Sequence, residues 1–401
     1  MWQNQLVRHA IRRLRERDLP VAVSFWNGHV YTPPRHPLLT LKVNHARALG
    51  SLAAPSLGKL ATAYVQQQFD IGGNIRDILA VGERLCEPDA ALDKKGSSAL
   101  SWLRHTKPAD RKNISYHYDV SNDFYALWLD AQRVYSCAYF KSDCDDLDTA
   151  QKQKLDLICR KLMLKPGERV LDVGCGWGAL ILWAAKHYRA HCLGITLSKD
   201  QHAYVKEVVK QLGLEDRVEV RLMDYRDVPE SNPFDKIASV GMFEHVGRRN
   251  LNAYFGKIWR LLKPGGLVMN HGITATSLDS TELGNDIGEF IEQYVFPGGE
   301  LVHVARVMES LSTEGLECLD VESLRPHYAK TLWHWVERLE ANAEQARQLV
   351  GEQKFRIWRI YMAGSALAFT RGWISLFQVL AGKPEGNGSI PYPYRRDHVY
   401  S

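Results

Sequence analysis

The stretch VLDVGCGWG at residues 170–178 constrains the fold of this chain more than any other. Val170, Leu171 and Val173 are typical of a buried strand, and a helical pattern begins at Ala179. Between strand and helix, three alternating glycines permit a tight turn and let a ligand approach the backbone closely. This order is typical of sheets that bind nucleotide-like cofactors, although the same glycines also suit close packing of helix against strand. The rest of the chain must decide between these interpretations.

Composition narrows the class of protein. The chain has 401 residues, 45% of them hydrophobic, which is enough for two or more globular domains. Its net charge of +5 is small for this length, so we expect no nucleic-acid partner, whereas an anionic membrane surface is compatible. The seven cysteines contain no C-x-x-C pair, which predicts free thiols and no metal site. No apolar run reaches the roughly 18 residues that span a bilayer, and we expect a cytoplasmic protein.

We predict a small N-terminal α+β domain over residues 1–92. Asn27-Gly28 predicts a hairpin that joins Val21–Trp26 to His29–Thr32. Helical patterning continues to about residue 92, and residues 93–112 have the composition of a linker. The first helix is amphipathic and basic, and it either lies on a membrane surface or packs on its own domain with a solvated face. Its arginines are Arg8, Arg12, Arg13, Arg15 and Arg17.

Residues 113–401 alternate between helical and strand patterns, which predicts a parallel α/β sheet. A helix from about residue 148 ends at Lys165-Pro166-Gly167, just before the strand that carries the glycine turn. Two late strands, Leu316–Val321 and Ile374–Leu380, are expected to close the sheet as an antiparallel edge. The other strands are expected at Ala190–Thr196, Val218–Met223, Lys236–Gly241 and Leu267–His271.

Ligands bind beyond the carboxyl ends of the strands in such sheets, so the residues that follow each strand are candidates for a site. Thr196 and Gln201 follow the second strand, where Ser198 to Gln201 also forms a helix capping box. Asp224-Tyr225 follows the third strand and suits an adenine, unless it is a solvated loop. Two further candidates follow the fourth and fifth strands, where an acid/base site or a buried ion pair would fit. They are Glu244-His245 and His271.

Seven short motifs taken together resemble those of the cyclopropane-fatty-acyl-phospholipid synthases, most strongly over residues 113–380. The resemblance extends more loosely to the N-terminal domain, which is similar to the lipid-engaging module of that family. The motifs are Val170–Gly178, Thr196-Leu197-Ser198 with Gln201, Met242–Gly247, Phe296–Glu300, His117–Val120, Asn122–Tyr125 and Tyr135–Cys137.

The resemblance implies a class I methyltransferase fold, Rossmann-like, with a mostly parallel seven-stranded sheet that holds S-adenosylmethionine. It also implies methylene transfer from this cofactor to a cis double bond in a phospholipid acyl chain, giving a cyclopropane fatty acid. Asp224 and Tyr225 are placed near the adenine. The other implied cofactor contacts are Tyr135, Ser136, Gly174, Gly176, Thr196 and Gln201.

The same resemblance implies that bound bicarbonate removes the proton that is lost on ring closure. The implied site consists of the side chains of Cys137, Glu244, His271 and Tyr328 and the backbone of Ile273. A dry, aromatic pocket tolerates the carbocation that precedes closure, and Tyr328 and Phe296 are the preferred lining. Some family members have a cysteine at the position of Ser365, so a mechanism that requires a thiol there is in doubt.

The acyl chain must leave the bilayer, which implies a cap, and the segment 277–335 has the apolar content to form one. We expect the enzyme to attach peripherally to the inner membrane surface, and a homodimer is compatible with the family. Three alternatives stay open. They are methylation without ring closure, a lipid-binding protein with a decayed cofactor site, and methylation of a small molecule at nitrogen or oxygen.

Overall fold

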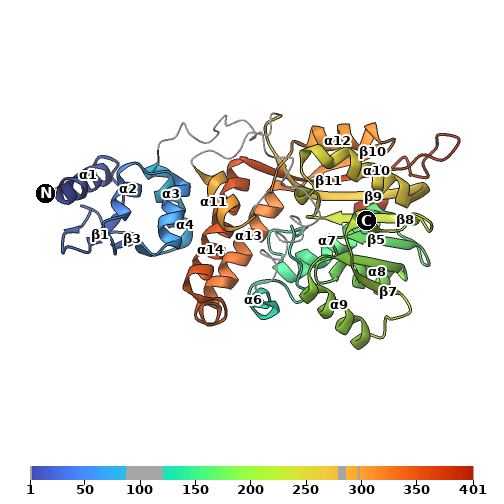
Figure 1. The fold of residues 1–401 in the computed structure, drawn as a ribbon, viewed down its shortest axis with the longest axis horizontal. Helices are drawn as coiled ribbons and strands as arrows, with labels where there is room; N and C mark the ends of the chain where they lie inside the picture. The colour runs from blue at the N-terminus through green and yellow to red at the C-terminus, as the bar shows by residue number, and fades with distance from the viewer. Residues whose placement is uncertain (1, 87–120, 279–285, 297–298, 401) are drawn as a thin grey trace. The chain divides into compact units, whose positions relative to one another are not determined.

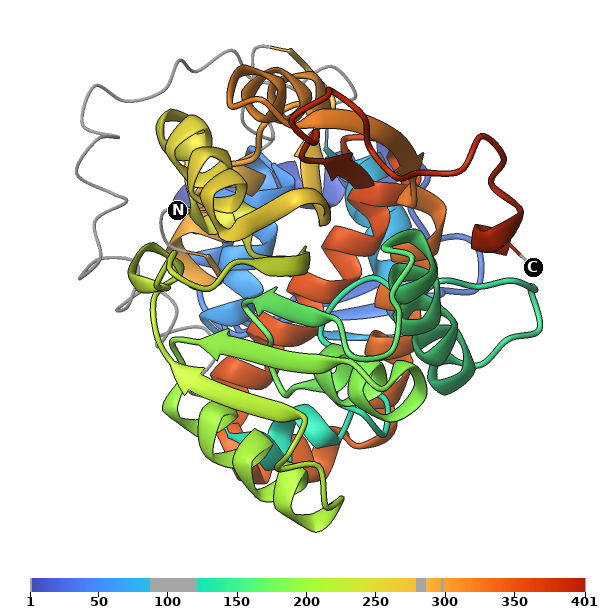
Figure 2. The same cartoon turned by 90° about the vertical axis from the view of Figure 1, so that its right-hand side faces the viewer.

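The computed structural model describes residues 2–86, 121–278, 286–296 and 299–400. The chain divides into two compact units, whose elements are drawn in Figures 1 and 2. Unit 1 contains residues 1–96, 281–297 and 339–367, and unit 2 contains residues 97–280, 298–338 and 368–401. The sequence-based division differs, since it placed everything after residue 113 in one catalytic domain. The expected linker 93–112 and the motif His117–Val120 lie outside the described residues.

Unit 2 is built on a seven-stranded sheet of order β10-β11-β9-β8-β5-β6-β7. The five strands β5 to β9 are parallel to their neighbours among themselves, and β11 is antiparallel to β9 and β10. The predicted mostly parallel sheet is confirmed. The strands are β5 (Arg169–Val173), β6 (His191–Thr196), β7 (Val218–Leu222), β8 (Phe234–Val240), β9 (Leu262–Ala275), β10 (Glu317–Ser323) and β11 (Ile374–Gly382).

The two late strands form as predicted, and they close one end of the sheet with antiparallel pairing. β11 lies inside the sheet between β9 and β10, so β10 is the edge strand and runs in the direction of β9. The 14-residue strand β9 explains this order, because it offers β11 an uninterrupted register from Leu267 to Ala275. Local patterning specifies that these strands exist, whereas pairing between distant segments specifies their order.

Helices cover both faces of this sheet. Within β5, Val170 packs with one apolar cluster while Leu171 and Val173 pack with another, as alternation along a doubly covered strand requires. The first cluster includes α7 (Leu147–Lys161), α8 (Ala179–Tyr188) and α9 (Lys199–Gln211). The second includes α10 (Leu251–Leu261) and α12 (Val304–Thr313). Shorter elements are α6 (Asn122–Ala126), η3 (Tyr225–Asp227), η4 (Phe243–His245), η5 (Arg248–Asn250) and α15 (Asp397–Tyr400).

The glycine turn after β5 adopts a backbone that only glycine accepts without strain. Gly174, Gly176 and Gly178 have φ of 84°, 54° and 84°. A Cβ on Gly178 would also meet Val205 Cγ2 at 2.9 Å. The turn therefore brings the start of α8 close to α9 at the carboxyl end of the sheet.

Unit 1 contains a four-stranded sheet of order β2-β1-β3-β4. The predicted hairpin is confirmed, because β1 (Val21–Phe25) pairs antiparallel with β2 (Val30–Tyr31). Two strands, β3 (Leu39–Val43) and β4 (Phe69–Gly72), were missed within the region predicted to be helical. The alternating burial along β3 is a period-2 signal that five residues carry weakly. The first helices are α1 (Trp2–Glu16), α2 (Ala48–Ala53), α3 (Leu57–Val65) and α4 (Ile75–Leu85).

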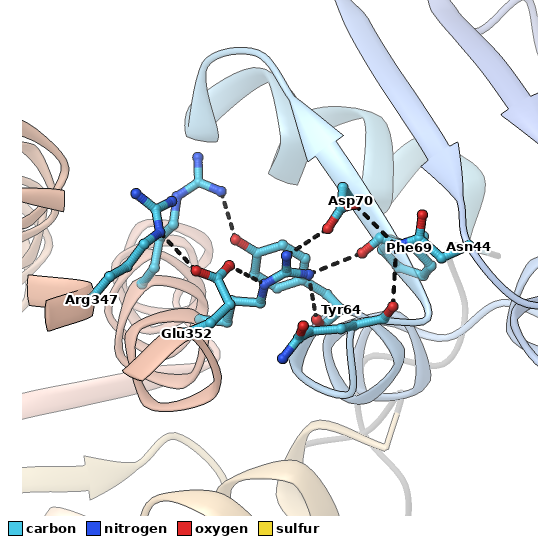
Figure 3. A network of polar contacts seen from close by, with 9 residues as sticks. Asn44, Tyr64, Phe69, Asp70, Arg347 and Glu352 are labelled. Carbon is cyan, nitrogen blue, oxygen red and sulfur yellow. Dashed lines mark hydrogen bonds and ion pairs between the residues drawn. The ribbon is translucent and has the colours of Figure 1, made fainter. Parts of the chain in front are cut away.

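The later segments of unit 1 are joined to its N-terminal part by close polar contacts. Asp286, which precedes α11 (Ile287–Tyr294), accepts a 2.5 Å hydrogen bond from Ser56 and pairs with Lys59 at 3.3 Å. A second group of contacts includes Tyr64, Asp70 and Glu352, which are labelled in Figure 3. Within it, the buried Arg356 of α14 (Ala343–Arg371) bonds to Asp70. These contacts explain why segments far apart in sequence belong to one unit.

The segment 277–335, which was expected to form a cap, is divided between the two units, and its role as a cap stays a prediction. α11 belongs to unit 1, whereas α12 buries Val307 and Leu311 in the core of unit 2 and β10 pairs within the sheet. α13 (Arg325–Ala341) follows, and the chain passes between the units within α13 and again within α14. In the part of the chain that the structure describes, no helix has the length and apolar character to cross a membrane.

Candidate active site

A pocket lies at the carboxyl edge of the sheet in unit 2, where the glycine turn and the ends of β6, β7 and β8 meet. All eight residues expected to contact a cofactor are on its wall. They are Tyr135 and Ser136 before α7, Gly174 and Gly176 in the turn, Thr196 at the end of β6, Gln201 in α9, and Asp224 and Tyr225 after β7.

Gln201 is held in a fixed orientation. Thr196 Oγ1 donates to its side-chain oxygen at 2.8 Å, and Ser198 Oγ accepts from its backbone N–H at 3.3 Å. Ser198 therefore caps α9 as expected, but the reciprocal bond of a capping box does not form, because the Ser198 N–H donates to Thr196 Oγ1 at 3.2 Å and Gln201 faces the pocket instead. Because the amide oxygen already accepts from Thr196, the amide NH₂ is the group left to hydrogen-bond a ligand.

Asp224 is neither solvated nor isolated. Its side chain is 9% exposed, and its carboxylate accepts from the backbone N–H of Arg226 at 2.9 Å and from the Arg226 guanidinium at 2.6 Å. Tyr225 packs edge-to-face on Tyr254, with ring centroids 5.3 Å apart. The loop after β7 is thus an ordered part of the pocket wall, and the alternative of a solvated acid is wrong.

Two buried charged residues of the pocket wall were missed by sequence reasoning. Lys154 of α7 is buried, and its Nζ donates to Ser136 Oγ at 2.9 Å. Burial lowers the pKa of Lys154 to about 8, and burial raises the pKa of Asp172 in β5 to about 7 despite the nearby Lys154 charge. The available signal was a lysine next to Leu155 on the apolar face of its helix and an aspartate inside an apolar strand.

The five residues expected to form the anion site do not line this pocket themselves, but three of them adjoin residues that do. Cys137 follows Ser136, Glu244 precedes His245, and His271 pairs with Val240 of β8. Glu244 lies in η4, and its Oε1 accepts from the backbone N–H of Ile273 in β9 at 2.7 Å. Burial raises the pKa of Glu244 to about 7, against the effect of that hydrogen bond. Its other oxygen, Oε2, is buried without a hydrogen-bond partner among the described residues.

His271 is buried in β9, one residue from the Gly272 that packs against Glu244. Its Nδ1 lies 3.2 Å from the side-chain nitrogen of Gln378, and its Nε2 has no hydrogen-bond partner in the described part of the chain. Burial, together with the charges of Lys154 and Lys161, depresses the pKa of His271 well below the usual value. His271 is therefore a neutral imidazole with one free ring nitrogen.

Cys137 and Tyr328 complete the set. All seven cysteines are free, as predicted, and Cys137 Sγ donates to the carbonyl of Ala138 at 3.2 Å. Burial raises the pKa of Cys137, so it is a thiol and a hydrogen-bond donor. The ring centroid of Tyr328 lies 4.7 Å from that of Phe369 and 5.9 Å from that of Trp335. The Trp335 centroid in turn lies 5.3 Å from that of the pocket residue Tyr135.

Two other expected residues lie in unit 1. Phe296 contacts Tyr361 edge-to-face at 5.8 Å, and Ser365 is a half-buried residue of α14. Both belong to a different unit from the pocket. Their expected roles near the reacting chain stay predictions.

A seven-stranded sheet of this order, with a glycine turn and a pocket at its carboxyl edge, defines the chain as a class I S-adenosylmethionine-dependent methyltransferase. Residues 105–379 match the family model described as mycolic acid cyclopropane synthetase. The chain belongs to this family, as the sequence motifs predicted. Residues 10–86 match a second family model, which is described as a domain of unknown function.

Named relatives agree with this assignment. The chain is 46% identical over 387 residues to a probable fatty acid methyltransferase of Pseudomonas putida, covering 96% of this chain and 98% of the relative. It is 38% identical over 279 residues to cyclopropane mycolic acid synthase 1 of Mycobacterium tuberculosis, covering 68% and 96%. The crystal structure of mycolic acid cyclopropane synthase CmaA1 complexed with SAH and CTAB has a TM-score of 0.64 and 37% identity, covering 68% and 98%.

Proposed function

We propose that this enzyme transfers a methylene group from S-adenosylmethionine to the cis double bond of an unsaturated phospholipid acyl chain, forming a cyclopropane ring, with bound bicarbonate as the base. The observation that carries the proposal is a pair of buried polar atoms that have no hydrogen-bond partner among the described residues, Glu244 Oε2 and His271 Nε2, in two of the side chains that the family resemblance places at the anion. Buried polar groups are normally satisfied, so such a pair points to a small polar ligand.

Bicarbonate fits these two atoms by its own hydrogen-bonding groups. Its hydroxyl can donate to the Glu244 carboxylate, and its oxygens can accept from an imidazole N–H or a thiol. The buried Cys137 thiol and the His271 ring belong to the same set and lie within electrostatic range of Lys154. When bound, the anion supplies a weak base for the proton that is lost on ring closure.

The chain's own groups then have separate tasks. S-adenosylmethionine, when bound, would supply an electrophilic methyl group, and the pocket residues would hold and orient it, a positioning effect that can contribute several kcal/mol. Glu244, with a pKa of about 7, can take up or release a proton near neutral pH. The buried rings of Tyr328 and Trp335 exclude water and present faces that tolerate positive charge.

The proposal is tested by incubating the enzyme with unsaturated phospholipid vesicles and methyl-labelled S-adenosylmethionine, with and without added bicarbonate. We expect a cyclopropane product, identified by its mass and its high-field ring protons, and a rate that rises with bicarbonate. Glu244→Gln should lose most of this rate while binding S-adenosylmethionine as the wild type does. A methyl-branched or methylene product would instead support the alternative without ring closure, and a rate independent of bicarbonate would refute the proposed base.

We further propose that α1 attaches this enzyme peripherally to the anionic inner surface of the membrane. The structure divides its arginines into two groups. Arg13 donates to Ala53 O and Arg17 to Arg84 O, so these two hold α1 on its own unit. The exposed arginines are Arg8, Arg12 and Arg15.

Vesicle sedimentation tests this attachment. Each exposed cation near an anionic surface contributes about 1 kcal/mol, so replacing Arg8, Arg12 and Arg15 by Gln should weaken vesicle binding about 100-fold. The matched control replaces the exposed Lys186, Lys206 and Lys210 by Gln, which changes the net charge equally. Equal loss in both triple variants would mean that net charge, not α1, governs binding.

A further inference from the structure

A buried lysine of unit 2 fixes the orientation of a glutamine side chain. Lys161, at the end of α7, donates from Nζ to Gln378 Oε1 at 2.8 Å. The same ammonium bonds to Glu322 and lies 3.7 Å from Asp320. An ammonium group has donors and no acceptor, so the Gln378 amide must present its oxygen to Lys161 and its NH₂ group in the other direction.

That direction leads to His271. Gln378 in β11 is directly opposite His271 in β9, and its side-chain nitrogen lies 3.2 Å from His271 Nδ1. An amide nitrogen only donates, so Nδ1 must be the ring nitrogen that accepts. A neutral imidazole carries one proton, and it must therefore be on Nε2.

We infer that Lys161 and Gln378 are positioning residues that set the tautomer of His271, so that its Nε2–H is a hydrogen-bond donor to the bound anion. The role at the anion rests on the proposed function, whereas the tautomer follows from the contacts alone. A histidine of the opposite tautomer would present a lone pair to an anion, which repels it.

The position of Lys161 is also supported by a residue outside the sheet. Arg396, in the C-terminal segment, pairs with Asp320 at 3.0 Å, and Asp320 lies beside Lys161. Lys161 is 1% exposed, so its position does not depend on solvent. The ammonium therefore stays between its two carboxylates and the Gln378 oxygen, which keeps the amide from turning over.

The decisive variant is Gln378→Glu, which keeps the shape of the side chain and makes it an acceptor only. Lys161 stabilises the new carboxylate in its ionised form, and a carboxylate beside Nδ1 requires an N–H there. The proton of His271 should therefore move from Nε2 to Nδ1. Gln211→Glu is the control with the same charge change, since Gln211 is exposed on α9.

Nitrogen-15 NMR of histidine-labelled full-length enzyme reads the tautomer directly. The chain has 15 histidines, so His271→Asn identifies the signal. We expect a protonated Nε2 in the wild type and in Gln211→Glu, and a protonated Nδ1 in Gln378→Glu. A wild-type signal with the proton on Nδ1, or an unchanged tautomer in Gln378→Glu, would overturn the inference. The wild-type spectrum tests it even if the variant does not fold.

Steady-state kinetics then test the effect on the anion. Loss of one hydrogen bond to a charged group should raise the half-saturating bicarbonate concentration of Gln378→Glu by about 10- to 100-fold, with S-adenosylmethionine binding unchanged. A switched tautomer with an unchanged bicarbonate requirement would overturn the positioning role. Absence of any bicarbonate dependence in the wild type would count against the proposed function and leave the tautomer assignment standing.

Discussion

Replacing Arg356 by Met tests whether α14 and the N-terminal segment form one cooperative unit. The guanidinium donates to the carbonyls of Tyr64 at 3.0 Å and Phe69 at 3.1 Å, and it pairs with Asp70 and Glu352 at 2.5 Å each (Figure 3). Met keeps the apolar stem and removes every one of these contacts. The loss of stability then depends on how well the former partners of Arg356 are satisfied without it.

The four partners do not contribute equally. The two carbonyls are buried, and losing the guanidinium costs about 1 kcal/mol at each, although the Tyr64 carbonyl keeps a 3.0 Å bond from the Gln67 N–H. Glu352 keeps its 2.7 Å contact with Arg347, and Asp70 keeps a 3.0 Å bond from Asn44 and is 44% exposed, so the two lost ion pairs add only about 1 kcal/mol together. We therefore expect Arg356→Met to lower the free energy of unfolding of unit 1 by about 3 kcal/mol.

Hydrogen exchange with mass spectrometry in increasing urea measures this loss where it occurs. The backbone amides of β3 and β4 should lose protection at lower urea in Arg356→Met, while those of β5 and β6 in unit 2 stay unchanged. Arg347→Met is the matched control, because Arg347 pairs with Glu352 and stacks on Phe355 but reaches neither carbonyl. Equal stability of Arg356→Met and Arg347→Met would refute the reasoning. The result also bears on truncation, since deleting residues 1–92 would remove three of the four partners of Arg356.

Three further predictions follow from the pocket and its neighbours. The Glu244 carboxyl binds its proton more tightly in the folded protein, where its pKa is about 7, than in the unfolded chain, where it is 4.5. Raising the pH through this range should therefore lower the free energy of unfolding of the ligand-free wild type. Glu244→Gln should abolish this pH dependence, which amounts to about 3 kcal/mol of unfolding free energy. Urea unfolding of the two proteins at pH 5 and pH 8 measures it. Gly178→Ala should lower the free energy of unfolding by about 1–3 kcal/mol and weaken S-adenosylmethionine binding measured by calorimetry. Gly388→Ala is the control and should lose less stability, because Gly388 has a similar φ of 82° but open space around it. Thr196→Val should weaken the same binding about 5- to 10-fold by releasing Gln201, and an unchanged affinity would mean that the amide does not need its anchor.

Much of the site could be predicted because its residues follow a rule of topology. Thr196 ends β6, Asp224 and Glu244 follow β7 and β8, and the carboxyl ends of parallel strands meet at one edge. The glycine turn could be recognised because it needs positive φ at three alternating positions. Each of these signals is local, so the sequence carries it whether or not the chain is folded.

Other features depend on which segments meet. Lys161 and Gln378 are 217 positions apart, and their contact requires β11 to insert beside β9 in one register. Lys154 is an ordinary helical lysine in the sequence, and only its burial beside Ser136 makes it part of the pocket. The grouping of residues 339–367 with the N-terminal segment likewise depends on contacts across almost 300 residues.

The amino-acid sequence by itself determined the parallel sheet and the glycine turn, because periodicity and turn chemistry act between near neighbours. Its motifs identified the family by resemblance, and that resemblance implied the eight residues of the pocket wall. Only the tertiary structure decided which charged side chains are buried, which ring nitrogen of His271 carries the proton and which segments share a unit. These properties arise from desolvation and from hydrogen bonds between distant parts of the chain, and both require the folded arrangement to be known.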